Sequence, residues 1–536
     1  MRHVEGLAPS HAVASVAGKV SKAYEAAVAD DFRRGFDTNV RYNFAVAYRF
    51  IVWLLRLATK VFFRQIEIVG EEHIPSDAPV LFVGNHPNSL IDPILIITSC
   101  QRNVHFAAKD TLFSTRIMRF ILTRVGAVPV ARKDDHGASA GGKLDNDAAF
   151  TAMFGVLQRN GAIGIFPEGL SHDESQLARL KTGAARMALG GAQRTTKPVQ
   201  IVPCGLTFIH PKRFRSRVLV QYGTPIVVDD AWRAKHASDE KVAVRELTES
   251  IDAALRRLTI NAPDWDTVRA LDVVRRLYQP DEISIEQRVE LARRFNTFFA
   301  QVQHEPRVAA TMARVATYQQ NLDELGLTDR ELAHDLSKME IAARLLKHLG
   351  LVGFWLPMTV PGAPLHLPTV VFARLFGHKL TPRKDVIATT KLVIGMLLVG
   401  LSYAIAIGLL AWKASWRWAA LAAVLLPLSG WATLRVLDRL RLVRRGMGTL
   451  LRQLRFRHEV KALRDERVAL VREVVDVVTS VTPVGVTPLF PKHDPRRVDD
   501  EELHAAARSN ADLDAEFDRD ADGDRTASER NGDTAP

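Results

Sequence analysis

The feature that most constrains the fold lies between residues 64 and 230, where short runs rich in β-branched and aromatic residues alternate with stretches of helical periodicity. The runs read QIEIVG, PVLFVGNH, VHFAAK, GAVPVARK, AIGIFPEG, VQIVPCGLTF and RVLVQYG. Such alternation is typical of a layered α/β structure, in which helices cover a sheet. We therefore expect residues 64–230 to form an α/β domain with a central mixed sheet flanked by helices.

The region after this domain, residues 231–350, is expected to be helical. One stretch has a helix-start signal at Ser238–Glu240 and a stop at the Asn-Ala-Pro of 261–263. Its apolar residues recur at helical spacing: Val244, Leu247, Ile251, Leu255 and Leu258. A stripe of this kind is typical of a helix that packs on a core.

Two uncharged stretches predict a transmembrane helical hairpin over residues 385–437. Leu392–Trp412 is 21 residues long, which is about 31 Å as a helix and matches the hydrocarbon thickness of a bilayer. Trp418–Leu434 adds 17 more residues. Lysines and arginines flank the pair on both outer sides, which predicts that both ends lie in the cytoplasm. The alternative is a buried hairpin of a soluble protein.

Two further segments are expected at a membrane surface. Within residues 41–63, Arg49, Arg56 and Lys60 share one helical face while apolar side chains occupy the rest, which predicts an interfacial amphipathic helix. A helix packed on the soluble domain is the alternative, and both can hold. Residues 351–384 are apolar but interrupted by prolines, so we expect a membrane-surface or re-entrant segment and not one straight spanning helix.

The remaining segments differ in composition from the rest. Residues 1–40 form a lead-in without the apolar region of a signal peptide. Residues 438–484 are expected to form a basic helix suited to anionic lipid head groups, and residues 485–536 an acidic, disordered tail. The net charge of +12 indicates membranes or anionic substrates as partners, and no nucleic-acid-binding signature is present. Cys100 and Cys204 provide no disulfide framework, which favours a reducing compartment.

Polar residues follow several of the expected strands, where open α/β sheets place their active sites. His86 and Asp92 lie in NHPNSLID, and Arg132 closes GAVPVAR. Glu168 and Gly169 lie in FPEG, and a fourth block reads IVPCGL. Arginine suits bidentate phosphate recognition, and a histidine paired with a carboxylate suits general-base catalysis. Each block alone is a weak signal, but all four in order on one domain form a specific pattern.

Together these blocks resemble the motifs of the glycerolipid acyltransferase superfamily. Five residues separate His86 from Asp92, where four are usual. With FPEGLSHD and RLKTGAARMALG, this spacing resembles the fungal-type glycerol-3-phosphate and dihydroxyacetone-phosphate acyltransferases. The likeness continues through RALDVVRRLYQP, QRVELARRFNTFF and KDVIATTKLVIGMLL, and it covers about residues 65–410.

The resemblance implies that His86 and Asp92 are a catalytic pair. His86 would be the general base for the acceptor hydroxyl, and Asp92 would accept a hydrogen bond from the other ring nitrogen. On one unbroken helix, residues six apart point about 240° away from each other. Because Pro87 also disfavours helical geometry at His86, we predict that His86 lies in a loop that folds back to hydrogen-bond Asp92.

The resemblance also implies how substrates are bound. Arg132 would hold the acceptor phosphate, while Glu168 and Gly169 would shape the acceptor pocket. Asn85 would orient the loop or help to stabilise the oxyanion. Lys109, at another strand end, would add positive charge for a phosphate or for coenzyme A.

The function implied is that of a membrane-bound O-acyltransferase of phospholipid synthesis. It would move a fatty acyl group from acyl-CoA or acyl carrier protein to the 1-hydroxyl of glycerol 3-phosphate or dihydroxyacetone phosphate. The alternatives are a lysophospholipid such as lysophosphatidic acid as the acceptor, and a catalytically inactive membrane scaffold. No cofactor and no metal are expected. We expect the catalytic domain and both termini on the cytoplasmic side of the inner (cytoplasmic) membrane, in contact with membrane lipids.

Overall fold

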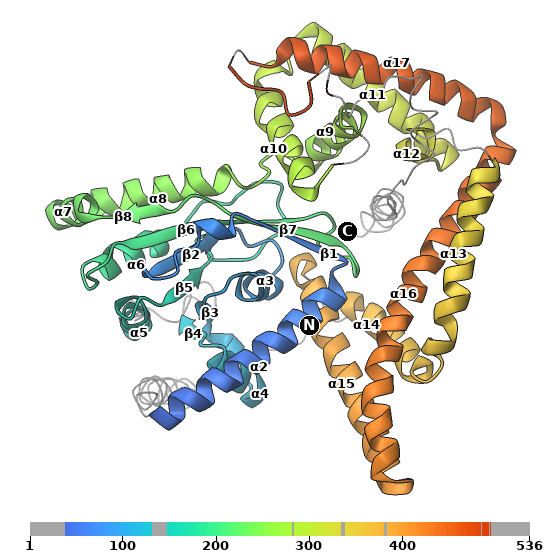
Figure 1. The fold of residues 1–536 in the computed structure, drawn as a ribbon. Coiled ribbons are helices and arrows are strands. Elements are labelled where there is room, and N and C mark those ends of the chain that lie inside the picture. The colour runs from blue at the N-terminus through green and yellow to red at the C-terminus, as the bar shows by residue number, and fades with distance from the viewer. Residues whose placement is uncertain are drawn as a thin grey trace, which may run out of the picture.

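In the computed structural model, the described residues are 38–130, 147–280, 283–333, 338–379, 383–483, 485–491 and 494. Most of the predicted lead-in and most of the predicted acidic tail lie outside the described residues. Arg132 lies outside them too. Figure 1 shows the described part as a sheet with its flanking helices, a helical unit beside it and a group of long helices.

The predicted central mixed sheet is confirmed. In the described part it has eight strands, in the order β1-β7-β6-β2-β5-β3-β4 with β8 paired to β6 (Figure 1). The strands are β1 (Gln65–Val69), β2 (Val80–Gly84), β3 (Val104–Lys109), β4 (Val128–Val130), β5 (Ala162–Ile165), β6 (Val199–Phe208), β7 (Arg217–Tyr222) and β8 (Ile226–Val228). β2, β5, β3 and β4 pair in parallel, so their carboxyl ends meet at one edge of the sheet.

The strand β6 changes partner along its length. Its first half pairs with β2 and β8, whereas Cys204–Phe208 pairs antiparallel with β7. Pro203 therefore lies in the middle of the strand, where the partner changes. The reason is that β7 continues the ladder beyond the point where β2 stops.

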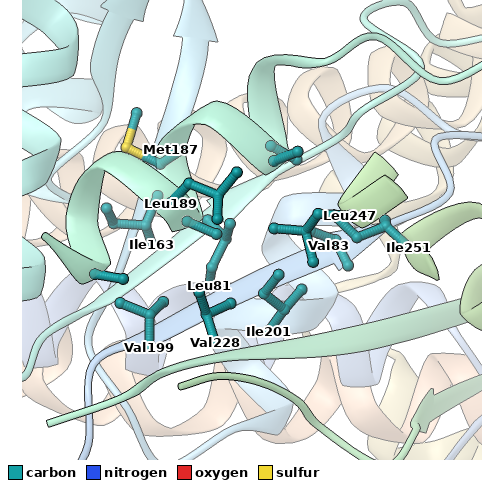
Figure 2. Close-up of a cluster of buried hydrophobic side chains, with 14 of the residues drawn as sticks. Leu81, Val83, Ile163, Met187, Leu189, Val199, Ile201, Val228, Leu247 and Ile251 are labelled. Carbon is teal, nitrogen blue, oxygen red and sulfur yellow. The ribbon is translucent and has the colours of Figure 1, made fainter. Parts of the chain in front are cut away.

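Helices cover both faces of the sheet. They are α2 (Thr38–Phe62), α3 (Ile91–Ser99), α4 (Arg116–Arg124), α5 (Asp147–Gln158), α6 (Gly183–Ala192), α7 (Asp230–Ser238) and α8 (Glu240–Arg256). Alternate residues of a strand point to opposite faces. Accordingly, Leu81 and Val83 of β2 join a cluster with α5, α6 and α8 (Figure 2), while Val80 and Phe82 join one with α2 and α3. Because β2 is buried on both faces, polar side chains that could act on a substrate lie beyond its ends and not along it.

The helix α8 belongs to the sheet domain and not to a separate helical domain. Asp239 caps its N-terminus by accepting a hydrogen bond from the Val242 N–H. Of its predicted core residues, Val244, Leu247, Ile251 and Leu255 are buried against the sheet, two of them labelled in Figure 2. The fifth, Leu258, lies beyond the end of α8 and is half-buried. The boundary that we predicted at residue 231 thus lies inside this layer, because the apolar stripe of α8 is buried by α6 and the strands.

A second core lies in the helical unit, which combines distant parts of the chain. It contains α9 (Trp265–Tyr278), α10 (Ile285–Val302), α11 (Pro306–Leu325), α12 (Asp329–Ala333) and α17 (Arg457–Val481). Val460, Leu470 and Val474 of α17 are buried in this core, and Arg467 pairs with Asp329. The basic helix predicted over 438–484 is therefore two helices, and the second packs on protein because it carries its own apolar stripe.

The long apolar helices extend away from the sheet (Figure 1). They are α13 (Lys338–Thr359), α14 (Ala363–Lys379), α15 (Ile387–Lys413) and α16 (Trp416–Arg455). α15 and residues Trp416–Gly448 of α16 are long and apolar enough to cross a membrane, and only 6% of the most apolar window of α15 is buried. α16 continues past the hairpin end predicted at residue 437. In the segment predicted over 351–384, residues 351–359 belong to α13 and residues 363–379 form α14.

The helix α2 packs one face on the sheet domain, which is one of the two alternatives that the sequence left open. Tyr48, Val52 and Phe62 are buried against the sheet domain, so one face packs on protein. Trp53 and Leu57 are 59% and 48% exposed on the other face. An exposed apolar face of this kind suits a membrane interface.

Candidate active site

The predicted hydrogen bond between His86 and Asp92 is confirmed. His86 follows the end of β2 in a loop, and Asp92 is the second residue of α3. The ring atom Nδ1 lies 2.8 Å from the Asp92 carboxylate atom Oδ2. Asp92 is fully buried, and its Oδ2 also accepts the Asn88 N–H at 2.7 Å. The carboxylate therefore holds both the ring and the loop that carries it.

Within the spacer between His86 and Asp92, Ser89 has an unusual backbone conformation. Its φ angle is 50°, in the left-handed region, which costs about 1–2 kcal/mol for a residue that has a side chain. The Ile91 N–H donates to Asn88 O and closes the turn into α3. Such a conformation persists only where surrounding contacts hold it. At Asn88 they do, since its side-chain amide donates to Pro211 O at 2.9 Å.

The ring of His86 is oriented by an aromatic contact that the sequence did not reveal. Phe166, the first residue of FPEG, stacks on it with ring centroids 4.1 Å apart and planes 6° apart. The His86 side chain is 13% exposed. Among the described residues, Nε2 has no hydrogen-bond partner, whereas Nδ1 is bound to Asp92. The arrangement therefore directs one ring nitrogen to a carboxylate and leaves the other for a bound molecule.

Glu168, which the sequence predicted to shape the acceptor pocket, supports the His86 loop. It is 2% exposed, and it accepts the His86 N–H at 2.9 Å and the Ala178 N–H at 2.8 Å. Its second oxygen also contacts the His172 ring. The carboxylate is thus engaged by the protein, because the loop after β5 folds back under residue 86.

Gly169 closes the turn that brings Glu168 under this loop. Its φ angle is 75°, a conformation that favours glycine, and its N–H donates to Phe166 O. A Cβ at this position would lie 2.7 Å from the Lys181 side chain. The glycine therefore shapes the site through the backbone turn.

Asn85 fastens the loop to the neighbouring strand. Its amide donates to Leu206 O at 3.0 Å and accepts the Leu206 N–H at 2.8 Å. These bonds support the loop-orienting alternative over oxyanion stabilisation.

Lys109 is the last residue of β3, which lies two strands from β2, and it is at the same edge of the sheet as the end of β2. Val130, the last residue of β4, is its partner in the neighbouring strand. Arg132 follows two residues later in the sequence and lies outside the described residues.

His172, from the run Ser171-His172-Asp173, is a site residue to which the sequence assigned no role. Its N–H donates to His86 O at 3.2 Å, and its ring contacts Glu168. The Glu168 contact raises the pKa of His172. The sequence signal was that this run, one residue after FPEG, belongs to the stretch FPEGLSHD, which resembles the fungal-type motif. Two histidine–carboxylate pairs thus lie together, one of them underneath the loop that carries the other.

Replacing Asp92 by asparagine is expected to preserve or increase stability at neutral pH. Burial raises the pKa of Asp92, and the hydrogen bond from His86 offsets this only in part. The folded chain then binds this proton more tightly than the unfolded chain, so the free energy of unfolding falls as pH rises through the folded-state pKa. An asparagine does not ionise and avoids that loss.

Thermal unfolding in detergent, followed between neutral and acidic pH, tests this prediction. The midpoint of Asp92→Asn should equal or exceed that of the wild type at pH 7. The difference should vanish below about pH 4, where the unfolded carboxyl is protonated as well. A variant that is clearly less stable than the wild type at neutral pH would contradict the sign of this argument.

A cavity of about 2050 Å³ lies next to the pair and continues toward the apolar helices. Asn85 and Pro87, on either side of His86, line it. Apolar side chains of α2, α15 and α16 border it: Leu54, Leu57, Leu392, Met396, Trp431 and Leu434. Eight lysine and arginine residues and three acidic residues also line it. The cavity therefore suits a molecule with a long apolar part and an anionic part.

Among the described residues, no group of three or more His, Cys, Asp or Glu side chains could hold a metal ion.

Comparison with known proteins finds two matching family models. The model described as Acyltransferase matches residues 65–207, and the model described as Glycerol-3-phosphate acyltransferase 2 C-terminal domain matches residues 270–486. The first covers the whole set of site residues, and the second covers most of the helical unit and the apolar helices.

Individual relatives agree with these models. The chain is 32% identical to glycerol-3-phosphate O-acyltransferase 2 of Saccharomyces cerevisiae, over 49% of this chain and 38% of that protein. It is 26% identical to glycerol-3-phosphate O-acyltransferase 1 of the same yeast, over 66% and 59%. It is also 24% identical to an uncharacterized acyltransferase of Schizosaccharomyces pombe, over 84% and 83%. The chain thus spans about half the length of the two S. cerevisiae relatives.

Proposed function

Because the chain belongs to the glycerolipid acyltransferase superfamily, as its two family models show, we propose that it transfers a fatty acyl group to a glycerol phosphate. The donor is acyl-CoA or acyl carrier protein, and the acceptor is the 1-hydroxyl of glycerol 3-phosphate or dihydroxyacetone phosphate. The observation that carries the proposal is the His86–Asp92 hydrogen bond, beside the cavity that Asn85 and Pro87 line, with the other ring nitrogen of His86 available.

In this mechanism His86 acts as the general base. Its Nε2 takes the proton of the acceptor hydroxyl while the hydroxyl oxygen attacks the carbonyl carbon of the thioester. Asp92 keeps the proton on Nδ1 and stabilises the imidazolium that forms. The carbon–sulfur bond then breaks, and the proton passes from Nε2 to the leaving thiolate. The stacked ring of Phe166 and the backbone contacts of Glu168 keep His86 oriented through both steps.

Positive charge in the cavity supports an acceptor and a donor that carry phosphates. Arg269 and Arg288 of the helical unit line the cavity together with Lys212. Arginine binds phosphate through a planar pair of donors. Arg132 is proposed to hold the acceptor phosphate, on the grounds of the family motif.

The apolar helices support action at a membrane surface. α15 and α16 are long and apolar enough to span a bilayer, and α2 exposes an apolar face close to the cavity. An acyl chain could therefore enter the cavity from the bilayer while the head group meets His86. The basic flanks of the hairpin favour a cytoplasmic location for the catalytic domain and both termini.

An acceptor assay separates the proposal from the alternatives. Membranes that carry the full chain are incubated with labelled acyl-CoA and with glycerol 3-phosphate, dihydroxyacetone phosphate or lysophosphatidic acid. We expect transfer to one or both glycerol phosphates. Transfer to lysophosphatidic acid alone would replace this proposal by the lysophospholipid alternative, and absence of transfer to all three acceptors would favour a scaffold.

A further inference from the structure

The beginning of the apolar helix α15 lies against the loop that carries His86, although the two are far apart in sequence. The Thr389 hydroxyl donates to Asn88 O at 3.2 Å across a separation of 301 residues. Thr389 is 5% exposed and its neighbour Ala388 is fully buried. Ala388 and Leu392 share one apolar cluster with Ile91 of α3. The end of a helix that suits a membrane is thus part of the core behind the catalytic loop.

Asn88, the residue that Thr389 contacts, links α15 to the catalytic pair. Asn88 accepts from Thr389 through its carbonyl and donates its N–H to the Asp92 carboxylate. The next residue, Ser89, has the left-handed conformation that needs outside support. Thr389 supplies such support one residue before it. A loss of this bond should therefore affect the Asn88 N–H and, through Asp92, the orientation of His86.

A second contact ties the same segment to the loop beneath His86. Asp385 is 7% exposed, contacts the Ser171 hydroxyl and pairs with Arg383 at 2.8 Å. Arg383 also donates to Ser171 O at 3.0 Å. The adjacent residue, His172, bonds to His86 O through its N–H. The segment 383–389 thus contacts both the loop that carries His86 and the loop that supports it.

We propose that Thr389 and Asp385 are positioning residues, through which docking of the apolar helix α15 completes the geometry of the His86–Asp92 pair. Acyl transfer then depends on α15 being seated against the catalytic domain. This inference rests on the proposed function for its kinetic consequence. Its structural consequence, the order of the catalytic loop, can be measured without any assay of activity.

The test compares full-length variants in detergent. Thr389→Val removes the hydroxyl, Thr389→Ser retains it, and Thr248→Val is the matched control because the Thr248 hydroxyl donates to Val244 O within α8. In Thr389→Val we expect kcat to fall by about three- to tenfold, the size expected for one lost hydrogen bond. KM should stay unchanged and Thr389→Ser should restore kcat. Amide hydrogen exchange over residues 84–92 should be faster in Thr389→Val and unchanged in Thr248→Val.

A double-mutant cycle tests the second contact. Ser171→Ala and Asp385→Ala should each speed exchange over residues 84–92, and the double variant should speed it no more than the stronger single variant, since both remove the same contact. Loop exchange that stays at the wild-type rate in Thr389→Val and in Asp385→Ala would overturn the inference. The inference would also be overturned if the activity of Thr389→Val, expressed per amount of folded protein, equalled that of the wild type. A wild-type chain that transfers no acyl group, with exchange behaving as expected, would remove the proposed function and leave the docking intact.

Discussion

Replacing His86 by alanine is expected to lower kcat for acyl transfer by about 10²- to 10⁴-fold, the usual contribution of general acid–base catalysis. The variant has no group to accept the proton of the acceptor hydroxyl or to return it to the thiolate. KM should change little, because in this mechanism the ring acts on the transferred proton. The measurement is initial-rate kinetics on purified protein in detergent micelles with phospholipid.

The control for this prediction is His304→Ala, at an exposed histidine after α10. It should retain wild-type activity. Both variants should unfold cooperatively, since Asp92 in the His86 variant keeps its bond from the Asn88 N–H, and activity is compared per amount of folded protein. Transfer at an undiminished rate by His86→Ala would exclude the general-base mechanism.

Replacing Glu168 by alanine is expected to destabilise the catalytic domain by about 2–6 kcal/mol, because two half-buried N–H groups lose the buried carboxylate that accepts from them, at about 1–3 kcal/mol each. These are the N–H groups of His86 and Ala178. The ring of His172 also loses its carboxylate partner. Activity should fall together with stability, because the lost contacts include the one beneath the catalytic histidine.

Denaturant unfolding of the catalytic domain checks this prediction, with Glu249→Ala as control. Glu249 forms an exposed pair with Arg245 in which both side chains are 69% exposed, and such pairs contribute about 0.2–1 kcal/mol. Glu168→Gln should retain part of the stability, since its carbonyl can accept one of the two N–H bonds. An alanine variant as stable as the Glu249 control would show that Glu168 faces solvent or substrate and not the loop.

The two parts of the catalytic site differed in how well the sequence predicted them. The His86–Asp92 contact could be predicted because it is local: the strand end, Pro87 and the start of α3 leave a short loop that must fold back. The contacts of Asn85 with Leu206 and of His86 with Glu168 join residues 121 and 82 positions apart. They depend on β6 and β5 lying on either side of β2. Periodicity does not reveal that strand order.

The sequence by itself determined the elements, because a strand or a helix follows from the spacing of apolar residues along a short stretch. It sufficed for the mixed sheet, for the core stripe of α8 and for the apolar hairpin. Only the tertiary structure decided what each element packs against. The apolar stripe of α17 is buried in the helical unit, and Thr389 at the start of α15 meets the catalytic loop. Both contacts form because apolar surfaces from distant segments are buried together. The spacing of residues within one segment does not show which distant segment it will meet.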